Sequence, residues 1–287
     1  MNTFTTSMFE SIKGALTKNN SEGGVSKIKD YLRTEVGNTY TVRLLPNVKD
    51  PSKTFFHYYS YGWNSLTTGQ LVTAISPTTW NQRDPIAEER FRILRNGTEA
   101  EKTKALAIKR RENWMVNVYV INDPVNAENN NKVKIVRFGR QLHKIIMDAI
   151  EGEEAAELGP RIFDLSPKGC NLKIKVEKQG DYPTYVSSKF AIPKEIEGID
   201  EDSYKKIYNS AFDLESYVSV KSYDDLKVLL DTHYHGTKDV DEDVSEIATI
   251  KPQQKTSAPV PVVEVKSTSK SKIEDEDSTI NDLLKDL

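Results

Sequence analysis

Apolar and polar residues alternate over several short segments in the middle of the chain. A period of two places every second side chain on the same side of an extended backbone, so each segment predicts a β-strand with one face on a core. The predicted strands are residues 38–46, 54–63, 114–121, 132–139 and 171–178. Residues 122–131 (NDPVNAENNN) are rich in turn formers, which predicts that residues 114–139 form a hairpin with a long loop.

The parity of three of these strands predicts which side chains point inward. The predicted inward residues are Tyr40, Val42 and Leu44, then Trp114, Val116, Val118 and Val120, and then Leu172, Ile174 and Val176. Trp114 shares its parity with the valines of its own strand, so its indole remains open between a core position and an exposed platform. Tyr119 is interpreted as a core residue.

A second pattern, with apolar residues at i, i+3, i+4 and i+7, predicts helices. The residues that follow it are Leu142, Ile145, Ile146 and Ala149, with a stop signal at Gly152. Amphipathic helices are also predicted over residues 202–215 and 222–231, the second with a capping box that begins at Ser222. Residues 84–109 are predicted to be helical in part. Strands and helices together predict a mixed α+β fold.

Both ends of the chain differ from this middle. Residues 1–22 place apolar residues at helical spacing and lead into a segment rich in Asn, Ser and Gly, which predicts a short helix on a flexible hinge. From residue 239 onward the chain is polar, with Pro, Ser and Thr, and cannot bury a core. We therefore predict a flexible N-terminal arm (residues 1–22), a folded core (residues 23–238), and a disordered linker with an acidic tail (residues 239–287).

The formal net charge of −3 conceals two regions of opposite sign. Residues 239–287 contain 12 acidic and 6 basic residues, whereas residues 104–144 contain 9 basic and 3 acidic ones. The basic segment suits a polyanionic partner. The acidic tail has two interpretations: a solubilising end, or a mobile imitation of a polyanion whose terminal Ile and Leu residues bind partner proteins.

Several classes of protein are not expected. The single cysteine, Cys170, excludes a disulfide within the chain and argues against a Cys-based zinc site. The sequence has no apolar run long enough for a signal peptide or a membrane span, so we expect a soluble, intracellular protein. It also lacks the GxxxxGK[ST], HExxH and GxSxG motifs, and we do not expect an enzyme.

The basic segment also contains aromatic residues, a combination that suits a single nucleic-acid strand. Such a strand presents a phosphate at every nucleotide and unstacked base faces, so a protein that binds it without reading sequence needs cations along a groove and flat rings. The candidate cations are Lys109, Arg110, Arg111, Lys132, Lys134, Arg137 and Arg140, and the candidate rings are Trp114, Tyr182 and Tyr185. Both tyrosines lie in a predicted loop, residues 181–190, which favours exposure. The alternative for the cations is a solvated face, but three adjacent cations beside Trp114 favour a binding role.

Three segments together resemble the T-even-type bacteriophage single-stranded DNA-binding proteins, also called helix-destabilising proteins. They are residues 113–146 (NWMVNVYVINDPVNAENNNKVKIVRFGRQLHKII), residues 42–47 (VRLLPN) and residues 280–287 (INDLLKDL). The resemblance implies an OB-fold-type β-barrel core with added helices and loop lobes, and an N-terminal arm for cooperative self-association. It also implies an acidic C-terminal tail that contacts replication and recombination proteins.

The resemblance implies roles for individual residues as well. Residues 109–111 correspond to a basic run before the central strand, and Trp80, Trp114 and Tyr185 to aromatic positions of the binding cleft. The residues implied in partner binding are Asp282, Leu283, Leu284, Asp286 and Leu287. The founding member holds a zinc ion through one His and three Cys. The corresponding residues here are Tyr61, Ala74, Asp84 and Ala87, so we expect no zinc and no other cofactor.

These observations predict a non-catalytic protein of the infected host cell's cytoplasm. It would coat single-stranded DNA without sequence specificity during replication, recombination and repair, and would recruit partners through its tail. Two alternatives remain open: an RNA-binding translational regulator that uses the same cleft, and an acidic-tailed scaffold that binds no nucleic acid. Competition between matched DNA and RNA oligomers distinguishes the first, and retention on single-stranded DNA-cellulose the second.

Overall fold

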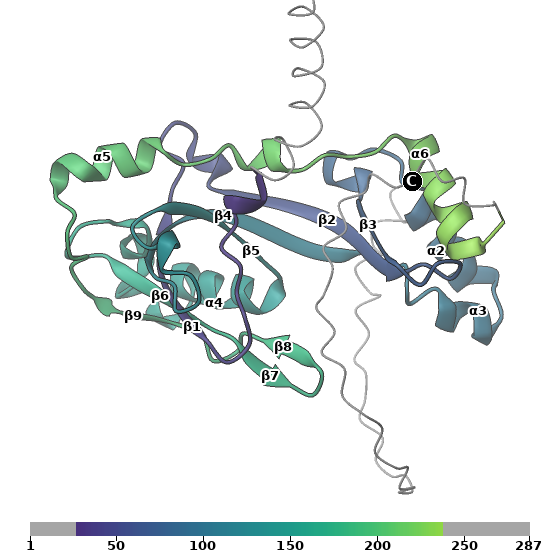
Figure 1. Ribbon diagram of the computed structural model, residues 1–287, viewed down its shortest axis with the longest axis horizontal. Coiled ribbons are helices and arrows are strands. Elements are labelled where there is room, and N and C mark those ends of the chain that lie inside the picture. Colours follow the sequence, from purple (N-terminus) through teal and green to yellow (C-terminus); the bar gives the residue numbers. More distant parts are fainter. Residues whose placement is uncertain (1–26, 238–287) are drawn as a thin grey trace, which may run out of the picture. The chain divides into compact units, whose positions relative to one another are not determined.

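The computed structural model describes residues 27–237, which all belong to one compact unit (Figure 1). The predicted arm (residues 1–22) and the predicted linker and tail (residues 239–287) lie outside the described residues. Within the described part, no helix is long and apolar enough to cross a membrane.

A seven-stranded, mainly antiparallel sheet forms the centre of the fold, in the order β3-β2-β4-β1-β6-β9, and β5 pairs with β4. Its strands are β1 (Thr39–Leu45), β2 (Phe55–Asn64), β3 (Leu71–Ile75), β4 (Arg111–Asn122), β5 (Val133–Phe138), β6 (Cys170–Lys175) and β9 (Lys189–Pro193). All five predicted strands are present, and β4 and β5 form the predicted hairpin. The first half of β4 pairs with β2 and the second half with β1, so this one strand joins two parts of the sheet.

The segment predicted as a loop, residues 181–190, contains two strands. Tyr182–Thr184 form β8, which pairs with β7 (Glu177–Gln179) in a small separate hairpin, and β9 begins at Lys189. Gly180 makes the tight turn between β7 and β8 with a positive φ of 60°, which glycine adopts without steric cost. The loop prediction was wrong here because backbone pairing partners decided the conformation, and the local residue preferences did not.

Five α-helices lie wholly within the described part of the chain, besides short 3-10 helices and a π-helix at Asp231–His235. They are α2 (Pro85–Asn96), α3 (Glu99–Lys104), α4 (Arg140–Glu151), α5 (Glu201–Asn209) and α6 (Tyr223–Leu230). The predicted cap of α6 is confirmed, because the Ser222 hydroxyl accepts the Asp225 N–H. The predicted helix over residues 202–215 ends early, at Asn209. The reason is Asn117, a buried side chain of β4 whose amide exchanges two hydrogen bonds with the backbone N–H and C=O of Phe212.

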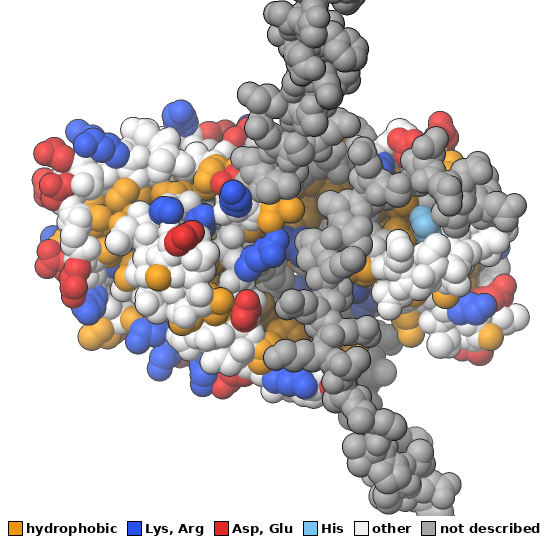
Figure 2. Space-filling model, viewed as in Figure 1, with side chains coloured by type: hydrophobic (Ala, Val, Ile, Leu, Met, Phe, Trp, Pro, Cys, Tyr) orange, Lys and Arg blue, Asp and Glu red, His pale blue; other side chains and the backbone are white. Residues whose placement is uncertain are grey.

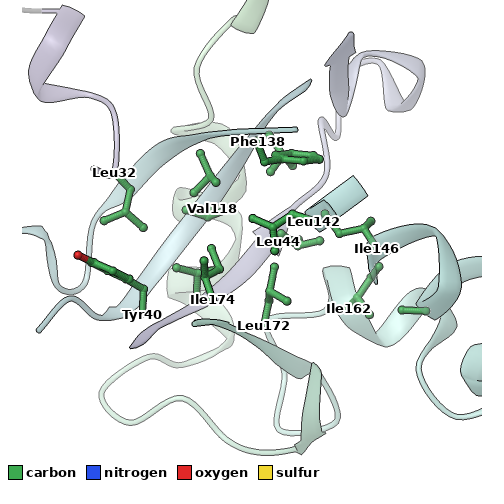
Figure 3. Close-up of a cluster of buried hydrophobic side chains, with 14 of the residues drawn as sticks. Leu32, Tyr40, Leu44, Val118, Phe138, Leu142, Ile146, Ile162, Leu172 and Ile174 are labelled. Atoms are coloured by element: carbon green, nitrogen blue, oxygen red, sulfur yellow. The ribbon is translucent and has the colours of Figure 1, made fainter. Parts of the chain in front are cut away.

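The main core lies between the sheet and α4 (Figure 3). The predicted inward residues of β1, β4 and β6, and Val176 directly after β6, are buried in it, except Trp114, which is half-buried. From α4, Leu142 and Ile146 pack into the same cluster. Each such Leu or Ile stabilises the fold by about 1.5–3 kcal/mol relative to an exposed side chain. Tyr119 is also buried, as interpreted, but in a second cluster on the opposite face, with Leu45.

The opposite side of β1 contains Arg43, whose side chain is 0% exposed. Its guanidinium donates to Asn171 Oδ1 from Nε (2.8 Å) and Nη2 (2.6 Å), and also to the backbone carbonyls of Lys194 (2.9 Å) and Asp164. Burial lowers the pKa of this arginine. These bonds compensate for the desolvation of the charge and connect β1 with the segments before β6 and after β9.

A further cluster forms a lobe at the far end of β2. Tyr61, Trp63 and Val72 from β2 and β3 pack there against residues of α2 and α6. Figure 1 shows β2 extending from the part of the sheet near α4 to this lobe.

Candidate nucleic-acid interface

Four rings lie in contact along one face of the sheet and onto α4. We call Tyr59, His57, Trp114 and His143 the aromatic row. Their ring centroids are 4.8 Å (Tyr59–His57), 5.0 Å (His57–Trp114) and 4.0 Å (Trp114–His143) apart. Tyr59 and His57 are two positions apart on β2, and His57 lies directly opposite Trp114 on β4. Because opposite residues of an antiparallel pair point to the same face, the register places these side chains together.

Two arginines lie beside this row, Arg110 at its Tyr59 end and Arg140 at the start of α4. The Arg110 guanidinium is 4.0 Å from the ring centroid of Tyr59, and its Nη1 donates to the Thr78 hydroxyl (2.8 Å). Arg140 is the first residue of α4 and is exposed to solvent. A cation above a tyrosine ring can bind a phosphate while the ring remains available at its edge.

Glu112 contacts both a ring of the row and one of the arginines. Its Oε1 is 2.9 Å from His57 Nε2 and its Oε2 accepts a hydrogen bond from Arg140 Nε (3.0 Å). The side chain is 22% exposed. Glu112 thus connects β2, β4 and the start of α4 next to the aromatic row.

Trp114 is neither fully in the core nor fully exposed, and so lies between the two positions that the sequence left open. It packs against the main core, where it stacks on Phe138 at 6.2 Å, yet it remains half-buried at the edge of that core. His143 covers part of the indole. Burial lowers the pKa of His143, and the charge of Glu112 opposes this shift only in part. At neutral pH the imidazole is therefore uncharged and suited to stacking on the indole.

Three of the predicted site residues lie on the opposite face of the sheet. Arg111 donates from Nη2 to the Gly62 carbonyl (2.9 Å). Arg137 lies beside Tyr58, where its charge opposes the pKa rise that burial causes in that tyrosine. The ring centroids of Trp80 and Phe56 are 6.3 Å apart, and Trp80 Nε1 donates to Glu215 Oε1 (3.2 Å). The structure therefore separates Arg111, Arg137 and Trp80 from the aromatic row.

The remaining predicted cations are at other places. Lys109 is exposed and precedes Arg110 directly. Lys134 donates to the Lys29 carbonyl (2.6 Å), four positions along β5 from Phe138, which is about 13 Å in a strand. Lys132 is exposed near the β4–β5 turn, farther from the row. Figure 2 shows Lys and Arg side chains among hydrophobic ones over much of the visible face, so basic residues are not confined to one place.

The two predicted tyrosines of the β7–β8 hairpin differ from each other. Tyr182 is 78% exposed. Tyr185 is half-buried against the main core, and its N–H donates to Gln141 of α4 (2.9 Å), the residue after Arg140. The hairpin therefore lies beside the α4 end of the aromatic row.

Tyr59, His57, His143 and Glu112 are not among the site residues predicted from the sequence. A signal for the first two was present, because the predicted strand over residues 54–63 places His57 and Tyr59 on one side. The pairing of β2 with β4 was not predictable from this pattern, and without it neither residue could be placed beside Trp114.

The four positions at which the resemblance implies zinc ligands lie close together in the lobe. Tyr61 and Ala74 are opposite residues of β2 and β3, and Tyr61 donates its hydroxyl proton to Asp84 Oδ2 (2.8 Å). Ser76 also donates to Asp84, and the other carboxylate oxygen accepts the N–H groups of Ile86 (3.0 Å) and Ala87 (3.2 Å) as the N-cap of α2. Among residues 27–237, no three His, Cys, Asp or Glu side chains form a group that could hold a metal ion.

Comparison with known proteins gives a family for this chain. The family described as gp32 DNA binding protein like matches residues 37–233. The single-stranded DNA-binding protein of Enterobacteria phage T4 is 26% identical over 192 residues, and that of Enterobacteria phage T2 is 26% identical over 191 residues. Each alignment covers 64% of this chain and 62% of the relative, so the chain spans less than two thirds of these proteins. The matched residues include the aromatic row, and this chain belongs to the gp32-like family of phage DNA-binding proteins.

Proposed function

We propose that this protein binds single-stranded DNA without sequence specificity. The observation that supports this best is the aromatic row with Arg110 and Arg140 beside it. Rings supply stacking surfaces that every base can use, and arginines supply charge for the phosphates between them. The names of the T4 and T2 relatives agree with this function.

We propose that the core is an OB-fold-type barrel with added helices and a loop lobe. The antiparallel pairing of β1 with both β4 and β6 supports a strongly connected sheet of this type. Residues 1–22 are proposed to mediate self-association on the strand, and the core to bind DNA during replication, recombination and repair. No cofactor is proposed, because the Asp84 hydrogen bonds already connect the parts of the lobe.

The first test compares two adjacent arginines that point to opposite faces. Wild-type protein should be retained on single-stranded DNA-cellulose, and log affinity should fall with log salt. Arg110→Gln should weaken binding and make that slope less negative by about 0.7, the value for one lost phosphate contact on a single strand. Arg111→Gln removes the same charge and serves as the control.

The comparison of these two variants determines which face binds. Equal effects of Arg110→Gln and Arg111→Gln would show that only the overall charge matters. Lack of retention of the wild type would reject the function itself. A matched RNA oligomer that competes better than DNA would favour an RNA-binding regulator.

We further propose that the acidic tail binds partner proteins through Asp282, Leu283, Leu284, Asp286 and Leu287. Deletion of residues 273–287, which contain six acidic residues, should leave single-strand binding unchanged or tighter, because a competing polyanion is removed. The same deletion should abolish capture of replication and recombination proteins of the phage on immobilised protein. Weaker DNA binding after the deletion would contradict a tail that imitates DNA.

A further inference from the structure

A carboxylate lies inside the surface that we propose for DNA phosphates. Glu112 is 3.0 Å from the Arg140 guanidinium and 2.9 Å from the His57 ring, beside the indole of Trp114. A fixed negative charge at this place repels a polyanion. The arrangement therefore requires an explanation beyond that of a simple binding surface.

Two explanations make opposite predictions. Glu112 could be a brace that holds His57 and Arg140 in the geometry that the strand requires, in which case removal of its charge would weaken binding. Alternatively, its charge could offset that of Arg140 and reduce the attraction for phosphate. The exposure of the groups favours the second, because Arg140 lies on the surface, where a salt bridge contributes little to stability and a phosphate can compete for the guanidinium.

We propose that Glu112 limits the affinity of the aromatic row for single-stranded DNA. In the free protein its carboxylate pairs with Arg140, and the incoming phosphate has to compete with this carboxylate for the guanidinium. The inference rests on the proposed function and adds a property to it. The protein binds less tightly than its rings and cations alone would permit, so an advancing enzyme can displace it more easily.

His57 belongs to the same arrangement. Its Nε2 contacts Glu112, and its ring lies edge-on to Tyr59 (76°) and tilted against Trp114 (36°). His143 is stacked on Trp114 at the end of the row. Glu112 thus orients one ring of the row while it offsets one cation. Glutamine at this position has nearly the same shape and retains an oxygen that accepts hydrogen bonds, so it removes the charge and preserves the orientation.

The test is Glu112→Gln, measured by titration of a fluorescent oligodeoxythymidine at several salt concentrations. We expect binding about 3- to 10-fold tighter at low salt, from the loss of one repulsive charge near the phosphates. The salt slope should become more negative by about 0.7, because the Glu112 carboxylate no longer competes with a phosphate for the Arg140 guanidinium. Thermal unfolding of the same variant establishes that it is folded.

Glu128→Gln is the matched control. Glu128 is an exposed acid in the turn after β4, ten or more strand positions and about 30 Å from Glu112, and its loss changes the net charge equally. This variant should bind nearly as the wild type does. A gain equal to that of Glu112→Gln would overturn the proposal, since only net charge would then be involved.

A second measurement uses Arg140→Gln in both backgrounds. The loss of affinity on Arg140→Gln should be larger in the Glu112→Gln background than in the wild type, because the Glu112 carboxylate then no longer offsets the charge of Arg140. Equal losses, or a Glu112→Gln variant that binds no tighter than the wild type, would reject the limiting role. These results assume that wild-type protein binds the oligonucleotide, and failure of that binding would instead reject the proposed function.

Discussion

Replacement of Trp114 by alanine is expected to weaken the binding of a single-stranded oligonucleotide about 5- to 150-fold, equivalent to about 1–3 kcal/mol for the loss of a stacking platform. The indole lies in the middle of the aromatic row, and both His57 and His143 contact it. Removal of the indole therefore removes a stacking surface for a base and also the ring that His57 and His143 pack against. Affinity should be measured by fluorescence anisotropy at a temperature where the variant is fully folded.

The same substitution should also destabilise the fold, because Trp114 packs on the main core. A half-buried aromatic should contribute less than the 3–5 kcal/mol of a fully buried one, and we expect a loss of about 1–3 kcal/mol in the free energy of unfolding. Binding and unfolding must therefore be measured separately. A lower unfolding free energy with unchanged affinity would make Trp114 a core residue only.

Trp80→Ala is the control for the face of the sheet. Trp80 is half-buried too, but it lies on the opposite face, against Phe56. If the aromatic row binds DNA, Trp80→Ala should reduce affinity much less than Trp114→Ala. The reverse order would place the interface on the face that contains Trp80, Arg111 and Arg137.

The largest effect on stability is expected from Asp84→Ala in the lobe. Asp84 is 2% exposed and accepts hydrogen bonds from Tyr61, Ser76 and two N–H groups at the start of α2. The loss of a helix cap lowers stability by about 0.5–2 kcal/mol, and the buried Tyr61 hydroxyl left without a partner adds about 1–3 kcal/mol, whereas the Ser76 hydroxyl keeps its hydrogen bond with Thr78. We expect a total of about 2–5 kcal/mol, or a Tm lower by about 4–20 °C, in thermal and urea unfolding.

Asp200→Ala provides the comparison. Asp200 caps α5 through the Ser203 N–H (2.9 Å) but is exposed, so water replaces the lost bonds. Asp200→Ala should therefore lower the free energy of unfolding clearly less than Asp84→Ala does. Tyr61→Phe should lower the free energy of unfolding by an intermediate amount, because it removes only one hydrogen-bond donor to Asp84. The Tyr61 phenol and Asp84 interact closely, since burial and the Asp84 charge both raise the pKa of the phenol. An Asp84→Ala loss no larger than that of Asp200→Ala would show that the hydrogen bonds do not hold the lobe together.

Local patterns were sufficient to predict much of the fold. The strands and α4 follow their hydrophobic periods closely. Val116 and Leu142, for example, are predicted to face inward by the local pattern and are buried in the folded protein. The end of α5 was not predictable, since Asn117 determines it from about 95 positions away. The candidate site could be predicted only in part for the same reason. Arg110 and Trp114 lie close together in the basic segment, whereas Tyr59 is brought to them by the pairing of β2 with β4.

Arg110 and Arg111 lie on opposite faces of the sheet because of the register of β4. Insertion of one residue within Arg111–Asn122 would move every later side chain to the other face, so the valines would leave the core and Trp114 would leave the row. Insertions in residues 123–131 would instead lengthen a surface turn. Natural variation in chain length among functional relatives should therefore be concentrated in that turn and be absent from β4.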